Sequence, residues 1–232
     1  MIESIENSKI KLLLKLRLAK YRKAEQKFIC EGAHLVKEAK QAGVLLEAYS
    51  LEEKEEYIQI TPTLMKKICN TDTIVSEIGL CSMLKKSDIT DKVLLLDGIQ
   101  DPGNMGSLMR SACAFGFHTI FIGTGSVDIY NDKVIRSSQG AIFKLNFRFG
   151  RISELVKELS HKIYSTNVIQ GTPLKSVPKE KRIAVILGNE GNGISPEVQQ
   201  LGFESIYIPM RNMESLNVAI AGSIILYELS QF

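Results

Sequence analysis

Five largely apolar segments lie in the second half of the chain, and stretches with helical character separate them. A strand that is apolar on both faces must be covered on both faces, and helices alternating with such strands provide that cover in a parallel sheet. The sequence therefore predicts an α/β domain over residues 92–232. The predicted strands are 93–99, 119–123, 163–167, 183–188 and 206–210, and the predicted helices are 105–115, 151–161, 196–201 and 215–230.

The first part of the chain, residues 1–88, has a different pattern and predicts a smaller α/β domain. A chain of 232 residues is long enough for one large or two small domains. The polar stretch 85–92 is the expected linker. Gly32 and Gly43 end a strand and a helix, and Pro62 follows a capping threonine. The predicted elements are helices over 8–19, 33–43 and 61–69, and strands over 27–32, 45–51 and 74–80.

Composition excludes several classes of protein. An apolar fraction of 44% with 24% charged residues is not that of a disordered chain. No apolar run approaches the roughly 20 residues of a membrane span, and the N-terminus does not resemble a secretory signal. The four cysteines and three histidines are scattered, so the sequence predicts no metal site. A cytosolic, metal-free protein is the expectation.

Residues 9–27 carry a concentrated positive charge. Their net charge is +7, whereas the whole chain carries +3, so the remainder sums to −4. The stretch is either the solvated face of a helix or a patch that binds RNA phosphates. Interleaved leucines indicate a folded segment, and the absence of aromatic anchors in its first half disfavours a membrane surface. The basic residues are Lys9, Lys11, Lys15, Arg17, Lys20, Arg22, Lys23 and Lys27.

The loop after the strand 93–99 predicts a site for a phosphate or a ribose. Asn104 is expected to cap the following helix and Gly116 to end it. Arg110 lies one turn into that helix, on the same side as Ser107. Free N–H groups at a helix N-terminus, together with an arginine, suit an anion. A capped helix with a solvated arginine is the simpler alternative.

Two later loops complete the set of candidate sites. The loop 188–195 has its glycines in the order G-x-x-G-x-G, which is not the dinucleotide fingerprint, so we set an NAD-dependent oxidoreductase aside. Its glycines still allow a ligand close to the main chain. The loop after 206–210 leads into the helix 215–230, which is apolar nearly all round. Such a helix must be buried, either in the core or in a dimer interface.

Three motifs follow strands in order: N-x-G-S-x-x-R (104–110), G-x-E-x-x-G (188–193) and I-P-M…S-L-N (208–217). Together they resemble the SpoU/TrmH family of S-adenosylmethionine-dependent RNA ribose 2′-O-methyltransferases. D-x-Y-N-x-K-x-x-R-S-S-x-G-A (128–141) and K-x-R-x-x-x-x-x-F-x-x-E-G (20–32) resemble further parts of that family, so the likeness covers nearly the whole chain. One departure concerns the domain junction, where many relatives have T-x-x-P-Q-G and this chain reads IVSEIGLCSMLKKSD.

The resemblance implies a parallel-sheet methyltransferase domain with a deep C-terminal trefoil knot, preceded by a small RNA-binding domain. It implies S-adenosyl-L-methionine as the methyl donor and a homodimer formed through the methyltransferase domain. A glycine-rich turn with apolar neighbours would independently suit an adenine ring. The expected donor-binding residues are Leu187, Gly188, Ile208, Met210, Leu216, Thr166 and Asn167. The expected RNA-binding residues are Lys9, Lys11, Lys20, Arg22, Lys23 and Arg136.

The expected chemistry needs no metal, because the donor's methyl group is already activated. Arg110 is often cast as the base in this family, but a guanidinium does not readily lose its proton. We expect Arg110 instead to hold a phosphate and to stabilise charge developing on the 2′-oxygen. The other expected catalytic residues are Asn104, Glu190, Ser215 and Asn217. For Glu190 the alternative is a structural carboxylate that accepts hydrogen bonds from loop N–H groups.

The expected substrate is structured RNA, with 23S rRNA favoured because the N-terminal part resembles the domains of rRNA-modifying relatives. A tRNA ribose methyltransferase remains an alternative. A non-catalytic RNA-binding protein would share the basic segment, but it would have no reason to retain Asn104, Arg110, Glu190 and Asn217 together.

Overall fold

The structure is a computed structural model, and it describes residues 1–70 and 74–230. The chain divides into two compact units. The N-terminal unit consists of Met1–Leu84 together with Asp128–Phe143, and the C-terminal unit consists of Lys85–Val127 together with Lys144–Phe232. Each unit has its own sheet and its own core, and each is described by itself.

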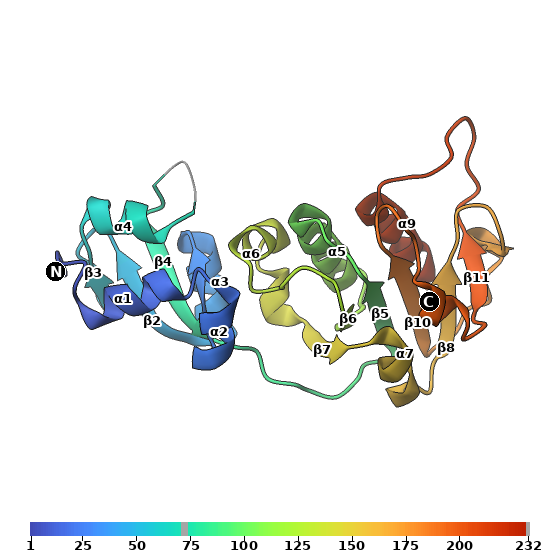
Figure 1. The fold of residues 1–232 in the computed structure, drawn as a ribbon, viewed down its shortest axis with the longest axis horizontal. Helices are drawn as coiled ribbons and strands as arrows, with labels where there is room; N and C mark the ends of the chain where they lie inside the picture. The colour runs from blue at the N-terminus through green and yellow to red at the C-terminus, as the bar shows by residue number, and fades with distance from the viewer. Residues whose placement is uncertain (71–73, 231–232) are drawn as a thin grey trace. The chain divides into compact units, whose positions relative to one another are not determined.

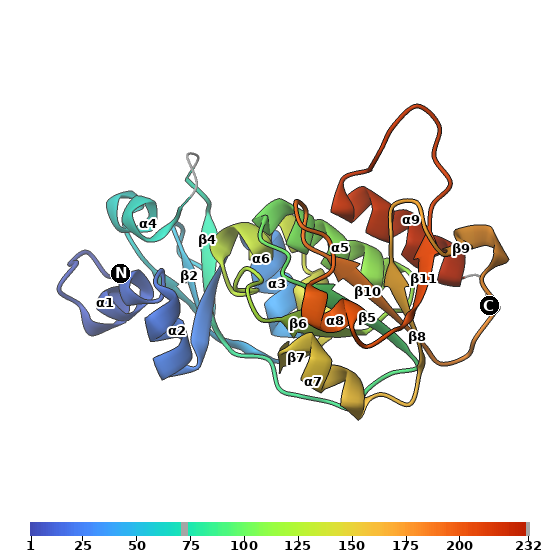
Figure 2. The ribbon, with the colours of Figure 1, turned by 45° about the vertical axis from the view of Figure 1, so that its right-hand side comes forward.

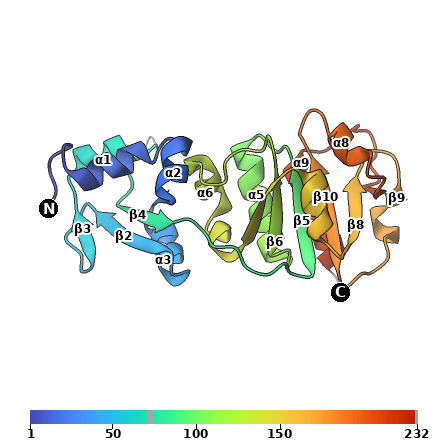
Figure 3. The same cartoon turned by 60° about the horizontal axis from the view of Figure 1, so that its bottom comes forward.

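The N-terminal unit contains a four-stranded sheet with the order β1-β4-β2-β3. Strands β1 and β2 both pair antiparallel with β4, and β3 pairs parallel with β2. Helices α1 and α4 share a core with one face of the sheet, and α3 contacts β1, β2 and β4 (Figure 3). The elements are α1 Ser8–Lys15, α2 Ala19–Glu25, β1 Lys27–Glu31, α3 Ala33–Gln41, β2 Leu45–Ser50, β3 Tyr57–Gln59, α4 Pro62–Ile68 and β4 Glu77–Ser82.

Most predicted elements of this unit are confirmed, but the helix predicted over 8–19 is shorter than predicted, and a second helix, α2, was not predicted. Helix α1 ends at Lys15, and Leu18 has an extended backbone before α2 begins. The carbonyls of Leu16 and Arg17 accept hydrogen bonds from Arg22 Nη1, at 3.0 and 2.9 Å. Arg22 thus satisfies carbonyl groups that a helix end leaves without partners. Strand β3 is short, only partly buried, and was not predicted.

Residues 128–143, which the sequence places in the predicted second domain, belong to the N-terminal unit in the structure. They form α6 Asp132–Ser138 and begin the 3-10 helix Ala141–Lys144. Asp128 pairs with Arg22 at 2.6 Å, and Arg136 pairs with Glu31 at 3.2 Å. The ring of Tyr130 lies 4.8 Å from that of Phe28. These charge and ring contacts explain why the segment joins the first unit, and local sequence pattern carries no sign of them.

The C-terminal unit contains a seven-stranded sheet with the order β7-β6-β5-β10-β8-β11-β9, in which every pairing is parallel (Figure 1). The predicted parallel α/β domain is therefore confirmed. Strands β7 and β9, at the two edges of the sheet, were not predicted, because β7 (NFRFG) is not a continuous apolar run and β9 has only two residues. The strands are β5 Lys92–Asp97, β6 Thr119–Gly123, β7 Asn146–Gly150, β8 Lys162–Thr166, β9 Thr172–Pro173, β10 Ile183–Gly188 and β11 Glu204–Tyr207.

Helices cover both faces of this sheet, as predicted. Helices α5 and α9 contact each other, and α7 contacts β5, β6 and β7 from the other side (Figure 2). The predicted helix 151–161 is α7 followed by a 3-10 turn, and α9 begins at Val218 instead of 215. No helix among residues 1–70 and 74–230 has the length and apolarity to cross a membrane. The elements are α5 Pro102–Ala114, α7 Ile152–Leu155, α8 Pro196–Gln199, α9 Val218–Ser230 and the 3-10 helices Val156–Glu158 and Leu174–Ser176.

Candidate functional site

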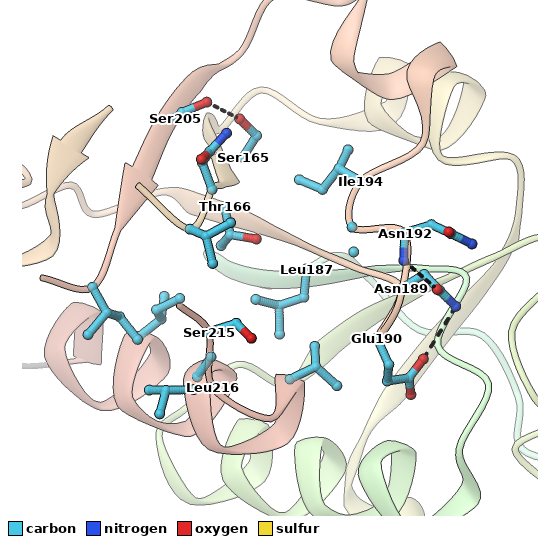
Figure 4. A pocket seen from close by; sticks show the side chains of 18 of the residues that line it. Ser165, Thr166, Leu187, Asn189, Glu190, Asn192, Ile194, Ser205, Ser215 and Leu216 are labelled. Atoms are coloured by element: carbon cyan, nitrogen blue, oxygen red, sulfur yellow. Dashed lines mark hydrogen bonds between the residues drawn. The ribbon is translucent and has the colours of Figure 1, made fainter. Parts of the chain in front are cut away.

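A cavity of about 860 Å³ lies in the C-terminal unit, at the carboxyl ends of β8, β10 and β11. Ligands of open parallel sheets bind at this edge. In Figure 4, Ser165 and Ser205 lie at one end of the cavity, Glu190 lies at the other, and Leu187 lies between them. All seven residues predicted to hold the methyl donor line it: Thr166, Asn167, Leu187, Gly188, Ile208, Met210 and Leu216.

The loop after β10 forms one wall of this cavity and depends on a glycine. A Cβ atom at Gly188 would lie 2.2 Å from the carbonyl carbon of Gly193, so only glycine allows the loop to fold back on itself. Asn189 and Gly193 exchange two main-chain hydrogen bonds, of 2.8 and 3.0 Å. The Asn189 side chain accepts from two loop N–H groups and donates to the Gly98 carbonyl at 2.8 Å. Sequence analysis did not single out Asn189, although asparagine before a glycine-rich turn is a signal for such a role.

The opposite wall is built from β8 and β11. Thr166 donates from its hydroxyl to the Ile186 carbonyl at 2.9 Å. Ser165 and Ser205 hydroxyls are 3.0 Å apart. The Asn167 side chain accepts from the N–H groups of Ile169 and Gln170 and so shapes the loop after β8. The walls therefore combine fixed polar groups with the apolar side chains of the last two loops.

Three predicted catalytic residues meet at the edge of the cavity. Asn104 Nδ2 donates to Glu190 Oε1 at 3.1 Å, and Asn217 Nδ2 donates to Asn104 Oδ1 at 3.0 Å. Asn217 also caps α9, because its Oδ1 accepts from the N–H of Ala219 at 2.9 Å. Residues from three distant loops, with Asn104 and Asn217 separated by 113 positions, thus form one hydrogen-bonded group, which we call the Asn104–Glu190–Asn217 cluster.

The predicted cap of α5 is wrong. Asp101 is the N-cap, and its carboxylate accepts from the N–H of Asn104 at 2.7 Å. Asn104 lies inside the first helical turn, with Pro102 before it. Aspartate is as good a cap as asparagine, and Pro favours the first helical position, so D-P-G-N contained both signals. Because Asp101 caps the helix, the Asn104 side chain is available for Glu190 and Asn217.

Glu190 accepts hydrogen bonds from the main chain as well as from Asn104. The N–H groups of Gln100 and Asp101 donate to its carboxylate at 3.3 and 3.2 Å. Burial opposes the charged form, but the hydrogen bonds from Asn104 and from these N–H groups hold the pKa of Glu190 below its usual value. Glu190 therefore has the expected structural role of accepting hydrogen bonds from loop N–H groups. Its lowered pKa favours an ionised carboxylate beside Asn104.

Arg110 and Ser215 lie outside this cluster. Arg110 is exposed on α5, two turns beyond Asn104, and among the described residues no hydrogen bond or ion pair engages its side chain. Ser215 lines the cavity but forms no hydrogen bond with the cluster in the described part of the chain. The structure thus brings Asn104, Glu190 and Asn217 together and leaves Arg110 with an uncommitted guanidinium.

The predicted RNA-binding residues differ in their surroundings. Lys9 and Lys11 pair with Glu47 and Glu6, each at 2.5 Å, and Arg136 pairs with Glu31 and Asp132. Lys20 and Lys23 are exposed. The side chain of Arg22 is only 7% exposed and pairs with Asp128, so it does not lie on the exposed surface of this unit with Lys20 and Lys23. A buried arginine bonded to two carbonyls and a carboxylate has no free face for a phosphate.

No group of three or more His, Cys, Asp or Glu side chains suited to a metal ion is found among the residues that the structure describes. The four cysteines are free thiols.

Comparison with known proteins is consistent with this geometry. Residues 91–227 match the SpoU rRNA Methylase family, and residues 7–75 match the MRM3-like substrate binding domain. A 23S rRNA (guanosine(2553)-2′-O)-methyltransferase, RlmP, from Bacillus subtilis (strain 168) is 33% identical, and the alignment covers 98% of each chain.

Two solved structures are also similar. A putative RNA methyltransferase of the TrmH family from Porphyromonas gingivalis has a TM-score of 0.84 and 28% identity, over 97% of this chain and 98% of that one. The SpoU methyltransferase AviRb from Streptomyces viridochromogenes, in complex with the cofactor AdoMet, has a TM-score of 0.88 over the same shares, and at 22% identity it supports the fold alone. With the family match spanning more than half of its length, this chain belongs to the SpoU rRNA methylase family, a family of RNA methyltransferases.

Proposed function

We propose that this protein transfers a methyl group from S-adenosyl-L-methionine to a ribose 2′-hydroxyl of 23S rRNA. The observation that carries the proposal is the Asn104–Glu190–Asn217 cluster at the edge of a cavity lined by all seven expected donor-binding residues. Three loops at the carboxyl edge of one sheet thereby supply both a cavity for a donor and polar groups for an acceptor.

The cavity suits the methyl donor. Leu187, Ile208 and Leu216 offer apolar surface for an adenine ring, and the fold-back at Gly188 leaves main-chain groups near the ligand. When bound, the donor supplies a sulfonium methyl group that needs no further activation. The polar side chains of Thr166 and Asn167 are already committed to main-chain partners, so they shape the cavity by holding its loops.

The chain's own residues position the acceptor. Asn104 and Asn217 are held by each other and by Glu190, so they present a pre-formed polar surface to a ribose. Arg110, with its exposed guanidinium, holds an adjacent phosphate and stabilises negative charge developing on the 2′-oxygen. Ser215 orients the ribose from the cavity wall.

Residues 1–88 bind the substrate RNA in this proposal. The match of residues 7–75 to a substrate binding domain supports this role, as does the +7 charge of residues 9–27. The 33%-identical relative named for 23S rRNA supports ribosomal RNA as the substrate. A putative tRNA/rRNA methyltransferase from Staphylococcus aureus (strain MSSA476), 29% identical over 62% of this chain, keeps tRNA as the second candidate.

The direct test is methyl transfer to defined RNAs. The purified chain is incubated with labelled S-adenosylmethionine and with either 23S rRNA or total tRNA, each free of modification, and methylated riboses are mapped by mass spectrometry. We expect one 2′-O-methyl group in 23S rRNA and none in tRNA. Methylation of tRNA alone would overturn the substrate, and donor binding without transfer to either RNA would contradict the assigned reaction.

We further propose a homodimer formed through the C-terminal unit. Ile220, Ile224 and Tyr227 lie on one side of α9 and are 40–55% exposed, and the Tyr227 ring contacts Phe115 at 5.5 Å. An apolar helix face of this kind is normally covered. Sedimentation should give twice the chain mass, and Ile224→Glu should give a monomer. A monomeric wild-type protein at micromolar concentration would contradict the dimer.

The resemblance to the SpoU/TrmH family leads us to propose a trefoil knot in the C-terminal unit. Strand β10 lies between β5 and β8 although it follows β8 in the chain, and α9 then contacts β10 and the 3-10 helix Leu174–Ser176. This return of the last helix past a segment that precedes β10 supports threading of the C-terminal chain through a loop.

A further inference from the structure

A second cavity, of about 550 Å³, lies on the other side of the loop 189–195, at the carboxyl ends of β5 and β6. Asp97, Gln100 and Thr124 line it, together with residues of the loop itself. We propose that this cavity receives the base of the methylated nucleotide and that Asp97 and Gln100 recognise that base as guanine. The inference rests on the proposed function, since it names the group that enters beside the methyl-transfer site.

The second cavity is joined to the Asn104–Glu190–Asn217 cluster by direct hydrogen bonds. The N–H of Gln100, a lining residue, donates to the Glu190 carboxylate. The Asn189 side chain donates both to Glu190 and to the carbonyl of Gly98, which also lines the cavity. A ribose at the cluster therefore has an opening beside it on the side away from the donor cavity, where its base can lie.

Asp97 gives the cavity its chemical character. Only 9% of this residue is exposed, and its Oδ2 accepts from the N–H of Ser195 at 2.8 Å. Its Oδ1 has no hydrogen-bond partner among the residues that the structure describes, so this oxygen of a cavity-lining residue is free to accept a hydrogen bond from a ligand. A carboxylate can only accept. Guanine, through N1–H and the N2 amino group, is the RNA base whose pairing edge places two donors side by side.

The remaining walls suit a planar ring. Gly98 and Gly125 have positive φ values, of 78° and 88°, and leave the floor without side chains. Ile194 and Pro196 offer apolar surface for the face of a base. The side-chain amide of Gln100 has no hydrogen-bond partner among the described residues, so it is available for the carbonyl at the guanine O6 position.

The test varies the base in the RNA and the carboxylate in the protein. Synthetic 23S rRNA hairpins spanning position 2553, the position in the name of the relative RlmP, are prepared with guanosine, inosine or adenosine there. Single-turnover methylation rates are then measured. With wild-type protein, inosine, which lacks the N2 amino group, should react about 10-fold more slowly than guanosine, and adenosine at least 100-fold more slowly. The wild-type series alone decides whether the base is read.

Asp97→Asn tests whether Asp97 is the residue that recognises the base. The variant should lose about 10- to 100-fold in rate on guanosine, and its ratio of guanosine to inosine rates should fall towards one. Donor affinity should be unchanged, because Asp97 does not line the donor cavity. Asp88→Asn, at an exposed position in the same unit, is the control and should keep the wild-type ratio. Gln100→Ala serves as a second variant should Asp97→Asn unfold, and it should weaken discrimination against adenosine.

The outcomes separate this inference from the proposed function. Equal wild-type rates on the three hairpins, or a wild-type inosine ratio retained in Asp97→Asn, would overturn guanine recognition while leaving the methyltransferase assignment intact. Donor binding without transfer to the hairpins or to full-length 23S rRNA would instead overturn the proposed function, and this inference with it.

Discussion

Two arginines in this chain lie in opposite surroundings. In the N-terminal unit, Arg22 is buried, pairs with Asp128 and bonds to two carbonyls. In the C-terminal unit, Arg110 is exposed and engages none of the described residues. Sequence analysis assigned both to RNA. A guanidinium whose N–H donors are bonded within the protein stabilises the fold, whereas one whose N–H donors are free can bind a phosphate.

The comparison extends to the two units. In the N-terminal unit, Lys9 and Lys11 also pair with carboxylates, so together with Arg22 three of the eight basic residues of 9–27 have an acidic partner. In the C-terminal site, neutral amides and one carboxylate bond to one another, and the cation is left out of the network. Charge density in sequence therefore does not measure the charge available to a ligand.

Removing the exposed Arg110 guanidinium should have the largest effect on methyl transfer. Arg110→Ala should reduce single-turnover methyl transfer by about 10²–10³-fold, because a donor aimed at developing charge is lost. Unfolding and donor affinity should not change, since the side chain is exposed and does not line the donor cavity. Near-normal transfer by this variant would remove Arg110 from the catalytic assignment.

Arg110→Lys separates two roles for the guanidinium. A lysine can lose its proton at elevated pH but cannot make a planar two-pronged contact. Transfer rates between pH 7 and 10 should stay low for this variant if Arg110 acts by bidentate positioning. Recovery of the rate as the pH rises would indicate that Arg110 serves as a proton acceptor.

Removing Arg22 should affect stability instead of chemistry. Arg22→Ala leaves Asp128 and two carbonyls without their donor, which should lower the free energy of unfolding by about 2–3 kcal/mol. Lys23→Ala, at the exposed neighbouring position, should change it by less than about 0.5 kcal/mol. Urea unfolding of both variants measures the difference. Equal stabilities would contradict a structural role for Arg22.

The sequence predicts best those helices and strands whose residue pattern lies within one continuous segment. The central strands β5, β6 and β10 are buried along their length, so their apolar runs predicted them within a residue or two. Edge strands β7 and β9 lack that pattern. The break between α1 and α2 is stabilised by Arg22, whose guanidinium donates to the carbonyls of Arg17 and Leu16, five and six residues before it. A pattern of apolar and polar residues does not show these side-chain hydrogen bonds.

The residues of the candidate site also differ in how well the sequence predicts them. The glycine-rich loop 188–193 and the later motif 208–217 marked the donor cavity, because each follows a strand whose end is fixed by the parallel sheet. The cap of α5 was misassigned to Asn104 because Asp101 and Asn104 are both good capping residues. The pairing of Asn104 with Asn217, 113 positions away, could come from the sequence only through family resemblance.

The paired and unpaired lysines of the N-terminal unit give a smaller effect. Lys20→Glu with Lys23→Glu should lower the slope of log affinity for RNA against log salt by about 0.7–0.9 for each lost phosphate contact. Lys40→Glu with Lys54→Glu is the charge-matched control, because Lys40 pairs with Glu56 and Lys54 pairs with Glu77. Donor affinity should be unchanged in all variants. A salt slope equal to that of wild type would mean that Lys20 and Lys23 are only a solvated surface.

The smallest expected effect compares two carboxylates. Burial raises the pKa of Glu31 above its usual value, because it outweighs the hydrogen bond from Asn70 and the charge of Arg136. Glu190 is opposite: burial works against ionisation, but the hydrogen bonds from Asn104 and the main chain prevail and lower its pKa. Titration followed by NMR of labelled glutamate should therefore give values on opposite sides of 4.5.

These opposite shifts predict opposite effects of pH on stability. The contribution of Glu31 is fully present below the ordinary pKa and is lost as the pH rises through its raised value, because the folded state holds this proton more tightly. The contribution of Glu190 is present above the ordinary pKa and is lost as the pH falls through its lowered value. Urea unfolding between pH 3 and 7 should thus show the advantage of wild type over Glu31→Gln shrinking with rising pH. The advantage of wild type over Glu190→Gln should shrink with falling pH. If both differences in the free energy of unfolding changed in the same direction with pH, the contrast between Glu31 and Glu190 would be contradicted.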